Sequence, residues 1–161
     1  MDAAFSPSSS CAGIGCIVRN DIGSWVKGWS SRLFAPNPFV CEILAIREGL
    51  RYYAQSLDKC IIASDCLVAV NSILSSAPPC GLYTNIILEC RDLLENSHHL
   101  KLMFEKRSAN EVADALAKFS LKDTTSCNGC FIWDFAPSFV SSLCTTDFVS
   151  AIEPLPPDQP P

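Results

Sequence analysis

Two kinds of apolar pattern run through the first 122 residues of the chain. Short segments rich in β-branched residues, bounded by turn residues, predict strands. These strands lie at residues 2–5, 12–19, 24–30, 59–64 and 100–104. Longer segments with apolar residues at helical spacing, such as Ile43, Ile46 and Leu50, predict helices. These helices lie at residues 40–54, 66–74, 82–95 and 109–121.

The resulting order, βββαβααβα, predicts an α/β fold. Residues 20–23 form the turn of a hairpin between the second and third strands. A hairpin meander followed by alternating strands and helices indicates a five-stranded mixed sheet with helices packed on it. Ser108 and Glu111 fit a capping box, which predicts that the last helix begins next to Ser108. Side chains at the ends of central strands can then meet side chains from the covering helices.

The chain changes character near residue 123. We predict one domain over residues 1–122 and a Ser-, Phe- and Pro-rich C-terminal tail over residues 123–161. Four aromatic residues of this tail are candidates to pack back on the domain: Phe131, Trp133, Phe135 and Phe139. The proline-rich end, residues 153–161, is typical of disorder, so we expect the tail to be partly disordered.

Composition narrows the class of protein. The chain has 161 residues, 48% of them hydrophobic and 18% charged, which is typical of a globular domain. Its net charge of -5 argues against binding to nucleic acid through the overall field alone, although it leaves room for a local basic groove. Because neither a secretory signal nor a membrane-spanning apolar run is visible, we expect an intracellular protein of the nucleus or cytoplasm, without membrane contact.

The ten cysteines form no regular disulfide framework, and most lie in apolar runs where free cysteine behaves as a small hydrophobe. Cys127 and Cys130 have the spacing of a metal or redox pair, but zinc needs four ligands and no second pair lies nearby. Gly13 and Gly15 begin a string similar to a dinucleotide-binding loop, but Val18 stands where a third glycine belongs. We therefore expect no organic cofactor.

Four acidic residues are the candidate chemistry: Asp2, Glu42, Asp65 and Asp114. Each lies in a different predicted element, and Asp65 ends an apolar strand. Any one of them alone fits a solvated surface group, and Glu42 and Asp114 also fit the favoured charge near a helix start. Carboxylates that converge repel one another unless cations hold them, and hard divalent ions such as Mg²⁺ take oxygen ligands.

Three segments carry a family resemblance: residues 2–5 followed by 12–20, residues 41–50 leading to 64–66, and residues 107–117. In order and spacing they resemble a type 1 ribonuclease H domain, in particular the reverse transcriptase-like domains of plant retroelement-derived genes. The likeness covers residues 2 to about 121. It implies a metal-dependent endonuclease that cleaves the RNA strand of RNA–DNA hybrids. It also implies that Asp2, Glu42, Asp65 and Asp114 hold two Mg²⁺ or Mn²⁺ ions.

The resemblance further implies a monomer that recognises its hybrid by backbone shape and 2′-hydroxyl groups. Lys106, Arg107 and Asn110 are candidate nucleic-acid contacts. For Arg107 and Asn110, phosphate contact and support of the Asp114 loop remain open alternatives, as do a simple helix cap and a solvated charge. Lys106 fits an ordinary surface residue equally well.

The chain departs from the family pattern in four ways. Only Met1 precedes Asp2, so we expect a truncated first strand that holds Asp2 poorly. Residues 104–107 contain no histidine, which predicts slow turnover, and Cys66 stands where serine is common. A Lys-rich protrusion is absent from the sequence, which predicts modest affinity for the hybrid. These departures keep a rival open: an inactive RNase H-like module that binds nucleic acid or protein, or a retroelement relic.

Overall fold

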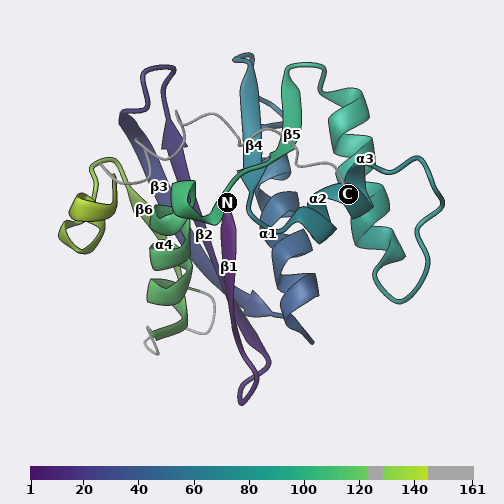
Figure 1. Ribbon diagram of the computed structural model, residues 1–161, viewed down its shortest axis with the longest axis horizontal. Coiled ribbons are helices and arrows are strands. Elements are labelled where there is room, and N and C mark those ends of the chain that lie inside the picture. Colours follow the sequence, from purple (N-terminus) through teal and green to yellow (C-terminus); the bar gives the residue numbers. More distant parts are fainter. Residues whose placement is uncertain (123–128, 145–161) are drawn as a thin grey trace, which may run out of the picture.

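A computed structural model describes residues 1–122 and 129–144 (Figure 1). The strands are β1 (Asp2–Ser6), β2 (Cys11–Arg19), β3 (Trp25–Phe34), β4 (Cys60–Ser64), β5 (Leu100–Phe104) and β6 (Cys130–Trp133). The α-helices are α1 (Pro38–Tyr53), α2 (Leu67–Leu74), α3 (Thr84–Asn96) and α4 (Glu111–Lys122). Two 3-10 turns are η1 (Arg107–Ala109) and η2 (Ser138–Val140). The predicted α/β order of the first 122 residues is confirmed.

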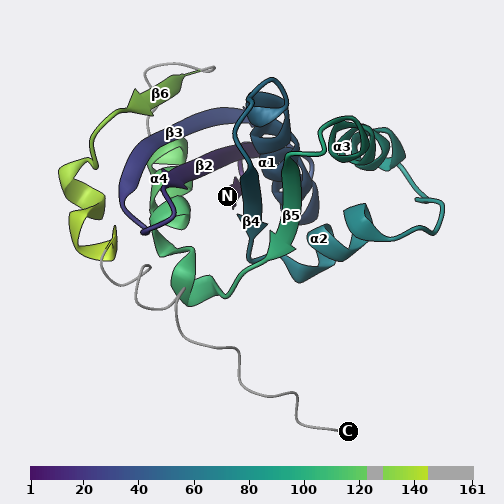
Figure 2. The same cartoon turned by 90° about the horizontal axis from the view of Figure 1, so that it is seen from above.

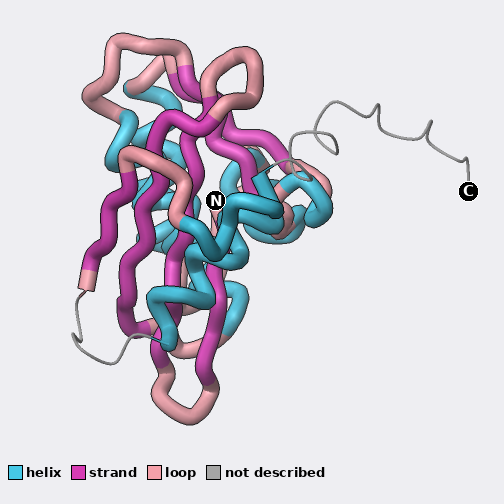
Figure 3. Tube along the Cα trace, turned by 90° about the vertical axis from the view of Figure 1, so that its left-hand side faces the viewer, coloured by secondary structure: helices cyan, strands magenta, loops and turns pink. Residues whose placement is uncertain are grey.

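The strands pair in two groups. β1, β2 and β3 form an antiparallel meander with β6 beyond β3, and β4 pairs with β5 in parallel. The chain approaches β4 just before β1 begins, where the Met1 nitrogen donates a hydrogen bond of 2.8 Å to the Ala63 carbonyl. Figures 1 and 3 show that this end of β1 lies in the middle of the molecule. The expected mixed sheet is therefore a meander and a parallel pair that meet at Met1.

Helices α1 and α4 both contact β2, and the alternation of its side chains explains how (Figure 2). Ile14 is fully buried in the large core that also contains the apolar stripe of α1. Gly13 and Gly15 point the other way, where an added Cβ would lie 2.1 Å from the Ala117 and Ala113 carbonyl oxygens of α4. The two glycines therefore allow α4 to approach β2 at backbone distance, a packing role with no connection to a phosphate loop.

Two helix starts differ from the sequence prediction. α1 begins at Pro38, earlier than predicted, because the Asn37 side chain accepts a hydrogen bond of 3.0 Å from the Val40 amide and proline fits the first turn. The predicted capping box at Ser108 is wrong. Ser108 lies in η1, and α4 begins at Glu111 after a separate turn.

Part of the C-terminal tail packs on the domain. β6 pairs with residues 28–31 of β3, and the Phe119 ring of α4 contacts Phe131, Trp133 and Phe139 at centroid distances of 5.0–5.5 Å. Phe135 instead remains 87% exposed. The predicted disorder of the tail concerns residues 123–128 and 145–161, and these, with Cys127, lie outside the described residues.

Over residues 1–122 and 129–144, no helix is both long enough and apolar enough to cross a bilayer.

Candidate metal centre

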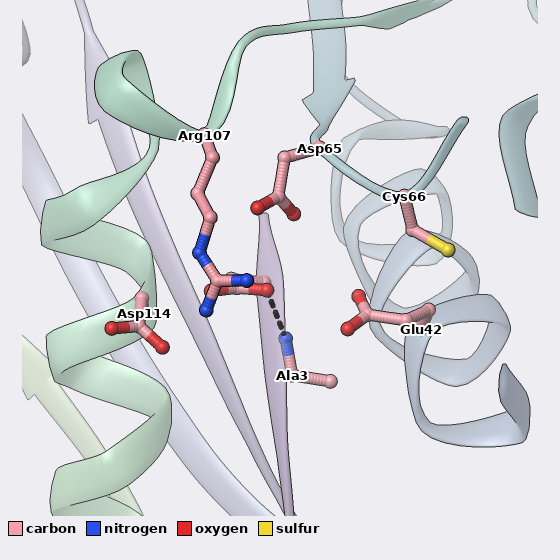
Figure 4. Close-up of a pocket in the computed structure, with 7 residues that line it drawn as sticks. Ala3, Glu42, Asp65, Cys66, Arg107 and Asp114 are labelled. Atoms are coloured by element: carbon pink, nitrogen blue, oxygen red, sulfur yellow. Dashed lines mark hydrogen bonds between the residues drawn. The ribbon is translucent and has the colours of Figure 1, made fainter. Parts of the chain in front are cut away.

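Three of the four predicted acids meet at one place. Carboxylate oxygens of Asp2, Glu42 and Asp65 all lie within 4.8 Å of one another. They come from β1, from α1 and from the residue that follows β4. Figure 4 shows the Glu42 and Asp65 carboxylates pointing into a shared space beside β1. Separate elements thus converge on a small cluster of oxygen donors.

Asp2 and Glu42 owe their positions to regular secondary structure. Asp2 pairs with Gly15 in the meander and is only 4% exposed, and its Oδ1 accepts a hydrogen bond of 2.8 Å from the Ala3 amide. Glu42 lies near the start of α1 between two fully packed neighbours, so its side chain leaves the helix at the margin of the core. Both carboxylates therefore have limited freedom to turn toward solvent.

Asp65 lies where β4 ends and α2 is about to begin. The preceding Ser64 is buried, and its hydroxyl accepts a hydrogen bond of 3.2 Å from the Cys66 amide. This bond bridges the Asp65 position and fixes the turn. The end of a buried strand therefore aims the Asp65 carboxylate at the other two acids.

The negative charge of the cluster is only partly compensated by cations of the chain. Burial, followed by the nearby Asp65 charge, raises the pKa of Asp2 from 3.8 to about 7. Burial, followed by the charges of Asp2 and Asp65, raises the pKa of Glu42 from 4.5 to about 8, against smaller opposing effects of the N-terminal ammonium and then of Arg107. Glu42 Oε2 is also buried without a hydrogen-bond partner among the described residues. A buried acceptor in this state favours a bound cation.

Asp114 and Arg107 complete the walls of the cavity. It has a volume of ≈ 220 Å³ and is lined by Asp2, Ala3, Glu42, Asp65, Cys66, Arg107 and Asp114. Asp114 lies in the first turn of α4 but accepts a hydrogen bond from Lys118, one helical turn away. Figure 4 shows the Arg107 side chain reaching from η1 into the space between Asp114 and the other acids. The structure thus places the fourth predicted acid at the cavity, outside the close cluster.

The candidate nucleic-acid contacts divide clearly. Arg107 reaches the cavity and has an exposed residue surface, whereas Lys106 is half-buried and does not line the cavity. Asn110 is only 5% exposed, and its Nδ2 donates a hydrogen bond of 2.9 Å to the Met1 carbonyl. For Asn110, this geometry favours support of the Asp114 loop over contact with a phosphate.

Two features of the site could not be found by sequence reasoning. Cys66 lines the cavity, and burial raises the pKa of its thiol above the ordinary value of 9.0. The sequence showed Cys66 only as a replacement for serine. The contact between Asn110 and Met1 joins residues 109 positions apart, and no local pattern indicates it.

Comparisons with known proteins bear on the family and the fold. The profile of the family described as "Reverse transcriptase-like" matches residues 1–120. No curated protein matches the chain. Among solved structures, RNase H1 from the halophilic archaeon Halobacterium salinarum NRC-1 is similar, with 19% sequence identity and a TM-score of 0.66. That match covers 76% of this chain and 95% of the other, and supports the fold, a ribonuclease H-like domain. The chain belongs to the reverse transcriptase-like family.

Proposed function

We propose that this domain is a metal-dependent endonuclease that hydrolyses the RNA strand of RNA–DNA hybrids with two Mg²⁺ or Mn²⁺ ions. The observation that carries the proposal is the convergence of Asp2, Glu42 and Asp65 within 4.8 Å. Family membership and the likeness to an RNase H1 structure support the same class of activity. The family description also supports an origin in a retroelement.

The residues fit divalent ions of the hard type. Mg²⁺ and Mn²⁺ prefer carboxylate oxygens, and the cluster offers them from a rigid strand, a helix and a fixed turn. The unpartnered Glu42 Oε2 is an acceptor that such an ion would satisfy. Asp2, Glu42 and Asp65 would hold one ion, and Asp114 would complete the ligand set for the second.

The chemistry divides between the ions and the chain. When bound, the ions would supply Lewis-acid activation of the attacking water and stabilisation of the leaving oxygen. Arg107 extends a planar, permanently charged guanidinium into the cavity, where it would hold the phosphate by two parallel hydrogen bonds. The hybrid would be recognised by its backbone and 2′-hydroxyl groups, because the cavity is lined mainly by charged side chains that would contact phosphates and not base edges.

Cleavage of a labelled RNA–DNA hybrid in Mg²⁺, and separately in Mn²⁺, tests the proposal. Asp65→Asn is the matched control because it keeps the size of the side chain and removes its charge. We expect cleavage of the RNA strand by the wild-type protein and its loss in the variant. A folded wild-type protein that cleaves nothing in either metal would contradict the proposal.

One observation favours the rival, an inactive RNase H-like module that binds nucleic acid or protein. Asp114 is paired with Lys118, which leaves one of the four expected ligands neutralised by the chain itself. Under this rival the protein would bind the hybrid without cutting it, and Asp65→Asn would leave that binding unchanged. A binding assay run beside the cleavage assay separates the two functions.

A further inference from the structure

Asn110 makes contacts in two directions. Its side chain is buried, with Nδ2 donating a hydrogen bond of 2.9 Å to the Met1 carbonyl and Oδ1 3.5 Å from the Met1 nitrogen. Its own backbone carbonyl accepts a hydrogen bond of 3.1 Å from the Asp114 amide. A single residue therefore connects the backbone next to Asp2 with the backbone of Asp114.

Met1 extends this connection to the other two acids. Its nitrogen donates a hydrogen bond to the carbonyl of Ala63, two residues before Asp65. Its side chain packs on Gly49 of α1, where an added Cβ would lie 3.1 Å from the Met1 sulfur. The same α1 helix carries Glu42. Contacts from β4, from α1 and from Asn110, the residue before α4, thus meet at Met1, next to Asp2.

We propose that Asn110 is a positioning residue that holds the Asp114 side of the site in register with Asp2 and thereby sets the affinity for divalent metal. The inference rests on the proposed function, because it assumes that the four acids are ligands. Residues behind the direct ligands orient them, and their loss typically weakens metal binding by about 10- to 100-fold. Only a side chain with an N–H donor can satisfy the buried Met1 carbonyl in this way.

Calorimetric titration with Mn²⁺, without nucleic acid, tests the proposal. Asn110→Leu keeps the approximate volume of the side chain and removes its hydrogen bonds, and Asn110→Ala is the second variant if the larger side chain prevents folding. Val112→Ala is the matched control, because it truncates a fully buried side chain in the first turn of α4 that belongs to a different core cluster from Met1. Thermal melting of every variant records stability separately.

We expect Mn²⁺ affinity to fall by about 10- to 100-fold in the folded Asn110 variants and to stay near the wild-type value in Val112→Ala. Wild-type affinity in the Asn110 variants would overturn the positioning role and leave the proposed function intact. An equal loss in Val112→Ala would also overturn it, because general destabilisation would then explain the effect. A wild-type protein that binds no Mn²⁺ would overturn the proposed function itself.

Discussion

The two walls of the cavity carry the same functional group in different electrostatic states. On the wall formed by α1 and the end of β4, Glu42 and Asp65 lie close to Asp2, and burial and mutual repulsion raise the pKa of both Asp2 and Glu42. On the α4 wall, Asp114 has a cationic partner in Lys118. Within the described residues the first wall is therefore only partly balanced by cations of the chain, whereas Asp114 on the second wall is paired with a lysine.

Arg107 lies between the two walls and shows how incomplete the internal compensation is. Its charge opposes the rise in the pKa of Glu42, which nevertheless reaches about 8. A guanidinium that reaches into the cavity from η1 therefore offsets only part of the repulsion. The close cluster, more than the α4 wall, therefore has the grouped carboxylates that the proposed metal ion would require.

Removal of one carboxylate from each wall should show the difference between the walls most strongly. Asp65→Asn should weaken the tightest Mn²⁺ binding by more than about 100-fold, because loss of a direct ligand should exceed the 10- to 100-fold cost of losing an outer contact. Asp114→Asn should weaken the same binding by less than about 10-fold, since Asp114 lies outside the close cluster. Calorimetric titration of both variants measures the difference.

The size of each side chain is kept in these two variants, so thermal melting should show both to be folded. Equal losses of affinity in the two variants would contradict the comparison. They would mean that both walls contribute alike to the first ion.

The pH dependence of stability should report the repulsion within the close cluster. In the folded metal-free protein Asp2 and Glu42 stay protonated up to about pH 7 and 8, whereas in the unfolded chain they ionise near their ordinary values of 3.8 and 4.5. Between these limits the unfolded state binds fewer protons, so the free energy of unfolding should fall as pH rises from about 4 to about 8. The loss should be on the order of a few kcal/mol. Urea unfolding at a series of pH values measures it.

Glu42→Gln isolates the contribution of one acid, since other groups also titrate in this range. The variant should be more stable than the wild type at pH 8.5 and should lose less stability between pH 5 and 8.5. Mg²⁺ should stabilise the wild type more at pH 8.5 than at pH 5.5, because protons compete with the ion at low pH. If the free energy of unfolding of the wild type rises over this range, ionisation of the buried acids does not destabilise the folded state.

The order of strands and helices was predictable because it depends on local periodicity. The α1 stripe and the β4 strand both appear in the sequence as apolar patterns, and the family resemblance singled out the acids beside them. The end of β3 was missed: the predicted strand ended at residue 30, yet residues 31–34 also pair with β2. That pairing is a long-range contact, which local patterns do not report.

Long-range contacts that local patterns do not report also determine the site. The capping box at Ser108 failed because Ser108 lies in the separate turn η1, and Asn110, whose side chain contacts Met1, stands between that turn and α4. The pairing of β6 with β3 and the ion pair of Asp114 likewise depend on which elements the fold brings together. Sequence could identify the acids, but not the contacts that decide which of them lie close together.

Lys118→Met offers the smallest and most specific test of the α4 wall. An exposed ion pair contributes less than about 1 kcal/mol, so the melting temperature should change little. Freed from Lys118, Asp114 should attract a cation more strongly, and affinity for the weaker of two Mn²⁺ ions should rise a few-fold while the tighter ion is unaffected. Lys122→Met is the control, since Lys122 makes no ion pair within the described part of the chain. Weaker Mn²⁺ binding in Lys118→Met alone would reverse the interpretation: the lysine would then hold Asp114 in place for the second ion, and the neutralised wall would be part of the prepared site.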